Sequence, residues 1–280
     1  MKRTAYKDEV REIVSKAKAE GKEIALVPTM GYLHEGHLSL IREAGKSGAF
    51  VVVSVFVNPI QFGPKEDLAS YPRDLEHDAR AAEAAGAGLL FHPEEEEMYS
   101  RPLVCSIDVG EMGKILCGAS RPGHFNGAAT VVSKLLNIVQ PARAYFGLKD
   151  YQQYLIIKKL VHDLDYPVEI VGMPIVREED GLAMSSRNVF LSREERTEAL
   201  VLSHSLSEAA EQIKSGEKRR SAVIEFITNR IKATSGVIDY VELRRANDLS
   251  VCEEIMGQIV IALAVRFGKT RLIDNMIVEG

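Results

Sequence analysis

The stretch that decides the fold is residues 24–57, which read IALVPTMGYLHEGHLSLIREAGKSGAFVVVSVFV. The apolar run from Ile24 to Val27 predicts a buried strand, and the spacing of apolar residues from His37 to Ala44 predicts a helix. The run from Phe50 to Val57 predicts a second strand, interrupted only by Ser54, as expected when both faces of a sheet are covered. Strand, helix and strand in this order indicate a parallel sheet.

The alternation of helices and strands continues through the first two-thirds of the chain. Helical spacing recurs in residues 7–20, 74–85, 130–139 and 151–161, and strand-like runs lie at 88–91, 144–145 and 168–171. We read the acidic run Glu94–Glu97 as a solvated loop. The pattern predicts an α/β fold built on a doubly wound parallel sheet.

The character of the sequence changes after Val176. Helical segments at 191–215 and 221–233 are followed by consecutive strand-like runs at 238–243, 258–267 and 271–278. This order predicts a smaller α+β domain with an antiparallel sheet. We place the boundary in the charged stretch Arg177–Gly181, which we expect to act as a hinge, and divide the chain into domains 1–176 and 177–280.

Composition excludes several classes of protein. The chain has 280 residues, a formal net charge of −5, 6% aromatic residues and no Trp, which argues against nucleic acid as a partner. The three cysteines are scattered and lack metal-ligand spacing, which indicates free thiols in a reducing compartment. The apolar runs are too short to span a bilayer, and no signal-type segment begins the chain, so we expect a cytoplasmic protein without a membrane partner.

The segment Pro28–His37, PTMGYLHEGH, carries the clearest chemical signal, because it lies where a parallel strand gives way to a helix. Ligands of open α/β sheets bind at such strand ends, and the free backbone N–H groups of a helix N-terminus suit phosphate. Gly31 and Gly36 permit close approach of the backbone. His34 and His37 lie three residues apart, on one helical face, where their cations would donate hydrogen bonds to phosphate. A metal site and two plain surface histidines remain alternatives.

Two further segments follow predicted strands. Asn58 and Gln61 are suited to hydrogen-bonding the hydroxyl or carboxylate of a substrate, and Phe62 to forming an apolar wall; the alternative is a simple turn. In FGLKDYQQ, residues 146–153, Lys149 is a phosphate-binding cation, Asp150 an N-cap or a ribose or metal ligand, and Gln153 lies one turn further on. A solvated Lys–Asp pair is the alternative there.

Two loops complete the candidates. Residues 180–188, DGLAMSSRN, place two hydroxyls and a guanidinium in a loop that can wrap a phosphate chain, or that merely precedes a helix beginning near Ser192. The glycine-rich loop Arg121–Gly127 offers Arg121 to a carboxylate or phosphate.

Taken together, these segments resemble a known family. His34-Glu35-Gly36-His37 resembles the HIGH motif of the nucleotidyltransferase superfamily, and Met184–Asn188 a relative of its KMSKS loop. More closely, the ordered set of segments is similar to the pantoate–β-alanine ligase family over roughly two-thirds of the chain. Leu148 stands where an acidic residue is expected, and Ser100 where a Pro usually follows Met-Tyr.

The resemblance implies a Rossmann-like domain, a smaller C-terminal lid domain, a homodimer, and Mg²⁺ bound through the phosphates of ATP, the co-substrate. It implies ATP-dependent condensation of (R)-pantoate with β-alanine through an adenylate, giving pantothenate, AMP and pyrophosphate. The ATP site would comprise Met30, Gly31, Tyr32, Leu33, His34, Glu35, Gly36, His37, Gly147, Leu148, Lys149, Asp150, Val176, Met184, Ser185, Ser186 and Arg187. Catalytic roles fall to His34, His37, Lys149 and Arg187, and substrate contacts to Gln61, Gln153, Asn58, Phe62, Pro28 and Thr29.

Rival readings stay open from the residues alone. A nucleotidylyltransferase acting on a phosphorylated substrate and a non-catalytic nucleotide-binding module both suit the same fold. Pyrophosphate exchange that requires a free carboxylic acid separates the ligase from both.

Overall fold

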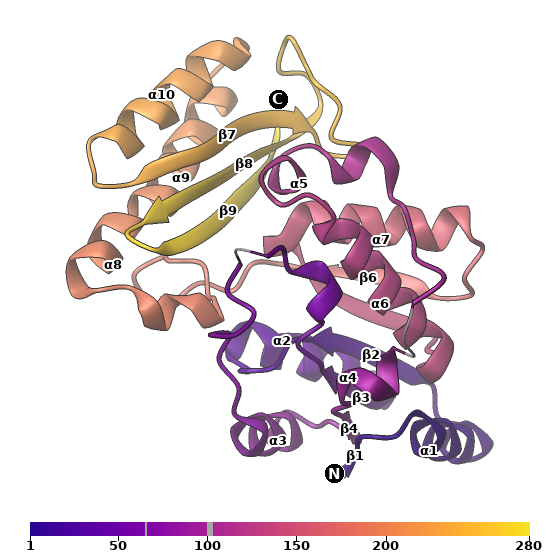
Figure 1. Ribbon diagram of the computed structural model, residues 1–280. Coiled ribbons are helices and arrows are strands. Elements are labelled where there is room, and N and C mark those ends of the chain that lie inside the picture. The colour runs from indigo at the N-terminus through magenta and orange to yellow at the C-terminus, as the bar shows by residue number, and fades with distance from the viewer. Residues whose placement is uncertain (65, 100–102) are drawn as a thin grey trace. The chain divides into compact units, whose positions relative to one another are not determined.

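The computed structural model describes residues 1–64, 66–99 and 103–280, so Ser100 lies outside the described residues. The chain divides into two compact units (Figure 1). The first comprises Met1–Leu148 and Ile156–Pro174, and the second comprises Lys149–Leu155 and Ile175–Gly280. Each unit has its own sheet.

The first unit contains a six-stranded, entirely parallel sheet, which confirms the predicted fold class. Its strands lie in the order β1-β4-β3-β2-β5-β6. The strands are β1 (Lys2–Thr4), β2 (Ile24–Thr29), β3 (Phe50–Val55), β4 (Leu89–Phe91), β5 (Arg143–Gly147) and β6 (Glu169–Met173).

Helices cover both faces of this sheet, which is why its central strands are apolar throughout. Side chains alternate along a strand, so Val27 and Val53 face α2 and α3, whereas the fully buried Leu26 faces the opposite side. There α1 and α6 pack against each other and against β2 (Figure 1). The helices are α1 (Lys7–Ala19), α2 (Glu35–Gly45), α3 (Leu75–Ala84), α4 (Glu95–Met98), α5 (Cys117–Ser120), α6 (His124–Val139) and α7 (Tyr151–Asp163).

The direction of winding reverses between β2 and β5, the topological switch point of the sheet. From β2 the chain adds β3 and then β4 on one side, and β5 begins the other side. Hydrogen bonding between β2 and β5 stops at Leu26 and Ala144, so the last three residues of the two strands do not pair with each other. The sheet therefore opens at its carboxyl edge, where ligands of such folds bind.

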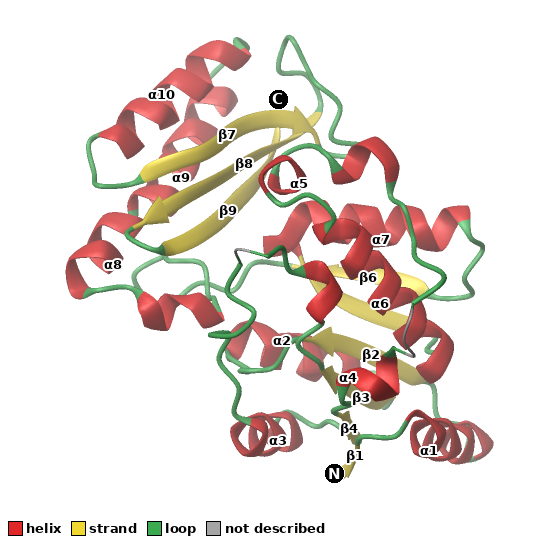
Figure 2. Cartoon of the chain, viewed as in Figure 1, coloured by secondary structure: helices red, strands yellow, loops and turns green. Residues whose placement is uncertain are grey.

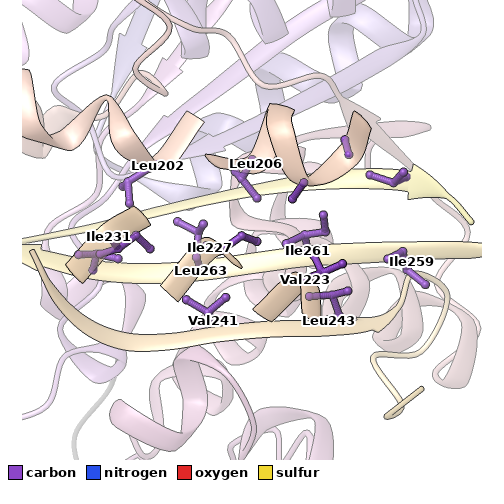
Figure 3. Close-up of a cluster of buried hydrophobic side chains, with 14 of the residues drawn as sticks. Leu202, Leu206, Val223, Ile227, Ile231, Val241, Leu243, Ile259, Ile261 and Leu263 are labelled. Carbon is purple, nitrogen blue, oxygen red and sulfur yellow. The ribbon is translucent and has the colours of Figure 1, made fainter. Parts of the chain in front are cut away.

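The second unit is a three-stranded antiparallel sheet, β7 (Val237–Arg245), β8 (Gln258–Phe267) and β9 (Thr270–Glu279), as expected for an α+β domain. Helices α9 (Val201–Lys214) and α10 (Arg220–Lys232) lie against it (Figure 2). Their apolar faces bury Leu202, Leu206, Val223, Ile227 and Ile231 against Val241, Leu243, Ile259, Ile261 and Leu263 (Figure 3).

Several local predictions are wrong. The acidic run includes the one-turn helix α4 because Glu95–Met98 buries Met98. Helix α6 begins at His124, so the second half of the supposed glycine-rich loop is helical. The predicted helix at 191–215 consists of α8 (Arg193–Ala199), which Ser192 begins with a capping box, and α9. Strand β1 was not predicted.

Truncating a buried residue of the second unit should reduce stability without touching the candidate site. Ile227 is fully buried, so Ile227→Ala removes methyl groups that the core cannot replace. We expect the free energy of unfolding to fall by about 2–5 kcal/mol. Urea denaturation followed by circular dichroism measures the loss. Val237→Ala, at a position 65% exposed, is the control and should change it by less than about 0.5 kcal/mol.

Candidate active site

The loop that joins β2 to α2 is held in shape by Asp78, a residue of α3. The Asp78 carboxylate accepts hydrogen bonds from the backbone N–H of Tyr32 at 2.9 Å and of Leu33 at 2.6 Å. Asp78 is only 1% exposed, and this burial raises the pKa of its carboxyl despite the two hydrogen bonds and nearby His77.

Gly31 is required by this arrangement. Its φ is +86°, and a β-carbon there would lie 2.8 Å from Asp78 Oδ2 and 2.9 Å from Val55 Cγ1. Tyr32 follows with a φ of +52°, which a side chain tolerates poorly. Glycine therefore permits a close approach of this loop to the buried carboxylate and to β3.

His34 and His37 form a reciprocal cap at the start of α2. Nδ1 of His34 accepts from the Gly36 N–H at 3.2 Å, and Nδ1 of His37 accepts from the His34 N–H at 3.3 Å. His34 is the N-cap rather than a first-turn residue, yet the two ring centroids lie 4.0 Å apart. Because a ring nitrogen that accepts carries no hydrogen, both rings in this arrangement are neutral and protonated at Nε2. The pair therefore carries its hydrogen on Nε2 in this arrangement, and the cations expected beside a bound phosphate stay a prediction.

Most backbone N–H groups of the loop are already occupied. Besides the bonds to Asp78 and to the two rings, Gly31 donates to Thr29 Oγ1 at 3.1 Å, and His37 donates to the carbonyl of His34 at 2.8 Å. Six N–H groups between Gly31 and His37 thus donate within the chain. The expectation of free backbone donors is therefore wrong for these six N–H groups.

The end of β3 places a second set of predicted residues near this loop. Asn58, which precedes the short helix η1 (Pro59–Gln61), and Gln61, its last residue, are 1% and 6% exposed. Gln61 Nε2 lies 3.1 Å from Met30 Sδ, which connects the β3 end to the β2 end. Phe62 packs edge-on against Tyr71, with ring centroids 6.1 Å apart, and its role as an apolar wall for a substrate stays a prediction.

Arg121, a candidate anion ligand, is engaged within the chain. Its Nε donates to Glu66 Oε2 at 2.9 Å, and its Nη1 lies 3.1 Å from His124 Nε2. Burial raises the pKa of Glu66, but the Arg121 hydrogen bond and charge outweigh it and hold that pKa below its usual range. Arg121 thus serves a part-buried ion pair.

The segment after β5 is anchored from the second unit's own sheet. Gly147 ends β5, and the short helix η3 (Leu148–Asp150) leads into α7, which carries Gln153. Within the second unit, Asn275 of β9 donates to the backbone carbonyl of Lys149 at 2.9 Å. Tyr151 donates to the carbonyl of Ala246 at 2.8 Å, and burial raises its pKa to about 12.

The charged stretch expected to act as a hinge is a hydrogen-bonded turn. The backbone N–H of Met184 donates to the backbone carbonyl of Val176 at 3.0 Å, and this hydrogen bond closes the turn. Arg177 forms a bidentate ion pair with Asp274 of β9, at 2.7 and 2.9 Å, and Asp274 is 2% exposed. Arg196 of α8 pairs with Glu178 and Asp180.

The loop Met184–Arg187 continues directly from this turn. Ser185 caps the short helix η4 (Ser186–Phe190) by accepting from the Arg187 N–H at 3.3 Å. Asn188 ties the loop back by donating to Glu178 Oε1 at 2.6 Å and to the Ala183 carbonyl at 3.2 Å.

The first unit therefore gathers one part of the predicted set at three strand ends. β3, β2 and β5 are neighbours, and they and the segments that follow them carry Pro28, Thr29, Met30, the loop to His37, Asn58, Gln61, Phe62, Gly147 and Leu148. The second unit carries the other part, namely Lys149, Asp150, Gln153, Val176 and Met184–Arg187.

Comparison with known proteins identifies the family. The model of the pantoate-beta-alanine ligase family matches residues 2–277. The chain belongs to this family.

Relatives agree over nearly the whole chain. A pantothenate synthetase of Desulfitobacterium hafniense is 62% identical over 272 residues, covering 97% of this chain and 96% of its own. The crystal structure of a Thermus thermophilus pantothenate synthetase superposes with a TM-score of 0.95 at 43% identity, covering both chains completely. A Francisella tularensis pantoate-beta-alanine ligase, solved with beta-gamma ATP and beta-alanine, matches with a TM-score of 0.82 at 34% identity over 99% and 97% of the two chains.

Some supporting residues of this ligase-family fold were missed from sequence. Asp78 was counted only as part of an Ala-rich helix, although it falls on the buried face beside Ala79 and Ala82. A carboxylate among buried alanines is a signal that a specific partner exists. The sequence around Asn275 and Tyr99 contains no comparable sign that their side chains hold other residues in place.

Substitutions at His37 separate its two nitrogens. His37→Asn keeps an acceptor near the Nδ1 position, so α2 should remain capped while adenylate formation falls on the order of 10²–10³-fold. His37→Gln keeps a donor near the Nε2 position, so it should lose less activity but about 0.5–2 kcal/mol of stability. Single-turnover adenylation and urea denaturation measure the two effects. Identical losses in both variants would contradict the assignment of the two nitrogens.

Asp78→Asn tests the support of the loop and its pH dependence. The carboxylate accepts one hydrogen bond on each oxygen, whereas the asparagine amide has only one oxygen. One of the two backbone N–H groups therefore loses its acceptor, and adenylate formation should fall on the order of 10-fold. Folding raises the pKa of the Asp78 carboxyl above its ordinary value of 3.8. The wild type therefore loses stability relative to the variant as the pH rises from 3.8 through the raised pKa. Urea denaturation of both proteins at a series of pH values, from about 3.5 to about 7, measures how the difference in their free energies of unfolding changes with pH. A difference that stays constant with pH would count against the raised pKa.

Proposed function

We propose that this chain condenses (R)-pantoate with β-alanine at the expense of ATP, through a pantoyl-adenylate, and releases AMP and pyrophosphate. The observation that best supports this is the pair of Nε2–H donors, His34 and His37, capping α2 at the switch point of the parallel sheet. The Francisella tularensis relative was solved with beta-gamma ATP and beta-alanine, which supports the same substrates here.

In the first step the pantoate carboxylate attacks the α-phosphorus of ATP, and pyrophosphate leaves. Negative charge grows on the phosphate oxygens, so donors already held in place contribute most to the rate. His34 and His37 supply neutral donors whose direction the helix cap fixes. Lys149 and Arg187 supply cations, and Ser185 and Ser186 supply hydroxyl groups.

The acid is bound by amide groups beside an apolar wall. Gln61 and Gln153 bind pantoate, with Asn58 behind Gln61 and Phe62 against the dimethyl group. The Thr29 hydroxyl donates to the Ser54 carbonyl at 2.8 Å and accepts from the Gly31 N–H, which holds Thr29 in place as a substrate contact of this proposal.

In the second step the β-alanine amine attacks the pantoyl carbonyl, and AMP leaves. The amine must first lose a proton, since its solution pKa is near ~10. Gln61 holds β-alanine beside the adenylate, which is worth an effective molarity on the order of 10⁵–10⁸ M. Residues 177–280, as a lid domain, keep water from hydrolysing the intermediate.

Magnesium fits as a companion of ATP. Mg²⁺ keeps water and phosphate oxygens as most of its ligands and needs only one or two carboxylates. Asp150, exposed at the end of η3 beside Lys149, offers one. In residues 1–64, 66–99 and 103–280, no three His, Cys, Asp or Glu side chains gather as a separate metal site would require. When bound, the ion neutralises charge on the leaving pyrophosphate.

The protein acts as a homodimer in the cytoplasm under this proposal. Cys105, Cys117 and Cys252 are all thiols, which supports a reducing compartment. Among the described residues no helix has both the length and the apolar character that crossing a bilayer requires.

The decisive experiment compares substrates one by one. ATP and pantoate together should support exchange of pyrophosphate into ATP, and AMP should accumulate on repeated turnover only when β-alanine is added. ATP with β-alanine alone is the control and should give neither. Exchange that needs a phosphorylated substrate instead would indicate a nucleotidylyltransferase, and binding of ATP without any AMP would indicate a non-catalytic module.

A further inference from the structure

A buried hydrogen-bond chain in the first unit runs from α6 to the side chain of Gln61. Asn58 Nδ2 donates to the carbonyl of Gly127 at 3.1 Å and to Gln61 Oε1 at 2.9 Å. The Tyr99 hydroxyl donates to Asn58 Oδ1 at 2.6 Å. Asn58 and Tyr99 are 1% and 4% exposed, so water cannot readily replace these partners.

The Gly127 carbonyl fixes the orientation of the Asn58 amide. A backbone carbonyl only accepts, so the Asn58 atom that faces it must be the nitrogen. The Asn58 oxygen then faces Tyr99, whose hydroxyl stays protonated because burial raises its pKa. The reverse orientation would place two oxygens 3.1 Å apart without a hydrogen between them.

Helix α6 can hold that carbonyl in place only because residue 127 is glycine. A β-carbon on Gly127 would lie 2.4 Å from the carbonyl oxygen of Ile60, in the backbone of η1. His124 ties the same two elements together, since its Nδ1 lies 2.8 Å from the Gln61 carbonyl. The backbone of Gln61 is therefore as firmly set as the amide of Asn58.

The orientation passes on to Gln61. The second hydrogen of Asn58 Nδ2 needs an acceptor, so Gln61 must turn Oε1 toward it. Gln61 Nε2 is left facing Met30 at the end of β2. Gln61 thus presents N–H donors, and no acceptor, toward the segment assigned to ATP and substrate.

We propose that Tyr99 is a positioning residue that acts through Asn58 to keep Gln61 a hydrogen-bond donor, so that this subsite selects an acceptor group of the acid, a carboxylate or hydroxyl oxygen. The inference rests on the proposed function, because it assigns Gln61 to pantoate. It assigns Tyr99 a role in substrate recognition without contact with the substrate.

Tyr99→Phe tests the inference, with Tyr166→Phe as the matched control. Tyr166 also donates a hydroxyl hydrogen bond to a neighbouring side chain, Ser133, but lies outside the chain of bonds to Gln61. Loss of the Tyr99 hydroxyl leaves a buried oxygen of Asn58 without a donor, so the KM for pantoate should rise on the order of 10-fold. The KM values for ATP and β-alanine should stay within about twofold in both variants.

A double-mutant cycle separates positioning from general stability. Gln61→Met keeps the size of the side chain but removes the donor, so adding Tyr99→Phe to it should change the KM for pantoate by less than about twofold. The inference would be overturned if the two substitutions multiplied each other's effect on the KM for pantoate in the double variant. Equal rises in the KM of all three substrates in Tyr99→Phe would also overturn it. If Tyr99→Phe fails to fold, Asn58→Asp serves instead, since it removes Nδ2 and turns Gln61 around; an unchanged KM for pantoate there would also overturn it.

The two proposals fail in distinguishable ways. A wild-type protein that forms no pantothenate contradicts the proposed function, and this inference with it. An active wild type whose KM for pantoate is insensitive to Tyr99→Phe contradicts this inference alone.

Discussion

Strands β2 and β5 hydrogen-bond to each other only as far as Leu26 and Ala144, and this interruption determines where chemistry can occur in the first unit. The sheet winds outward in both directions from the gap, so the loops that follow the two strands turn away from each other. The ends of β3, β2 and β5 then lie side by side at this carboxyl edge, and the strands themselves are largely buried.

The loop between β2 and α2, at this edge of the sheet, is held in shape by groups that need not touch a substrate. Asp78 satisfies two backbone N–H groups, and the two histidines satisfy two more. The loop is thereby fixed before any ligand arrives, and the histidine Nε2–H groups point in directions that the backbone determines. Donors fixed in this way need no reorganisation as charge develops, which is the main advantage an enzyme holds over water.

Much of the fold follows from local patterns in the sequence. Residues 24–57 predict a βαβ unit because β-branched runs buried on two faces differ clearly from a helix. Strand β1 was missed because Lys2–Thr4 is short and charged, and it gains strand structure only by pairing with β4. The HIGH-like motif identified the loop, but neither the occupied backbone donors nor the neutral rings can be inferred from composition or spacing.

Long-range partners set the limit of such prediction for the candidate site. The role of Asp78 depends on Tyr32, 46 residues away, and the role of Tyr99 depends on Asn58, 41 residues away. The amide orientation of Asn58 depends on the backbone carbonyl it faces, and the ring tautomers of His34 and His37 depend on the backbone N–H groups they face; only folding decides these neighbours. The sequence therefore predicts which residues line the site better than it predicts how they are held.

Strand β9 has a consequence for how the protein is made. Asp274 clamps the turn that precedes the Met184–Arg187 loop, and Asn275 holds the backbone at Lys149, more than a hundred residues earlier. A nascent polypeptide that has not yet released residues 270–279 from the ribosome cannot complete either anchor. Activity should thus arise only at the end of synthesis, and an incomplete chain is not expected to hydrolyse or transfer nucleotide.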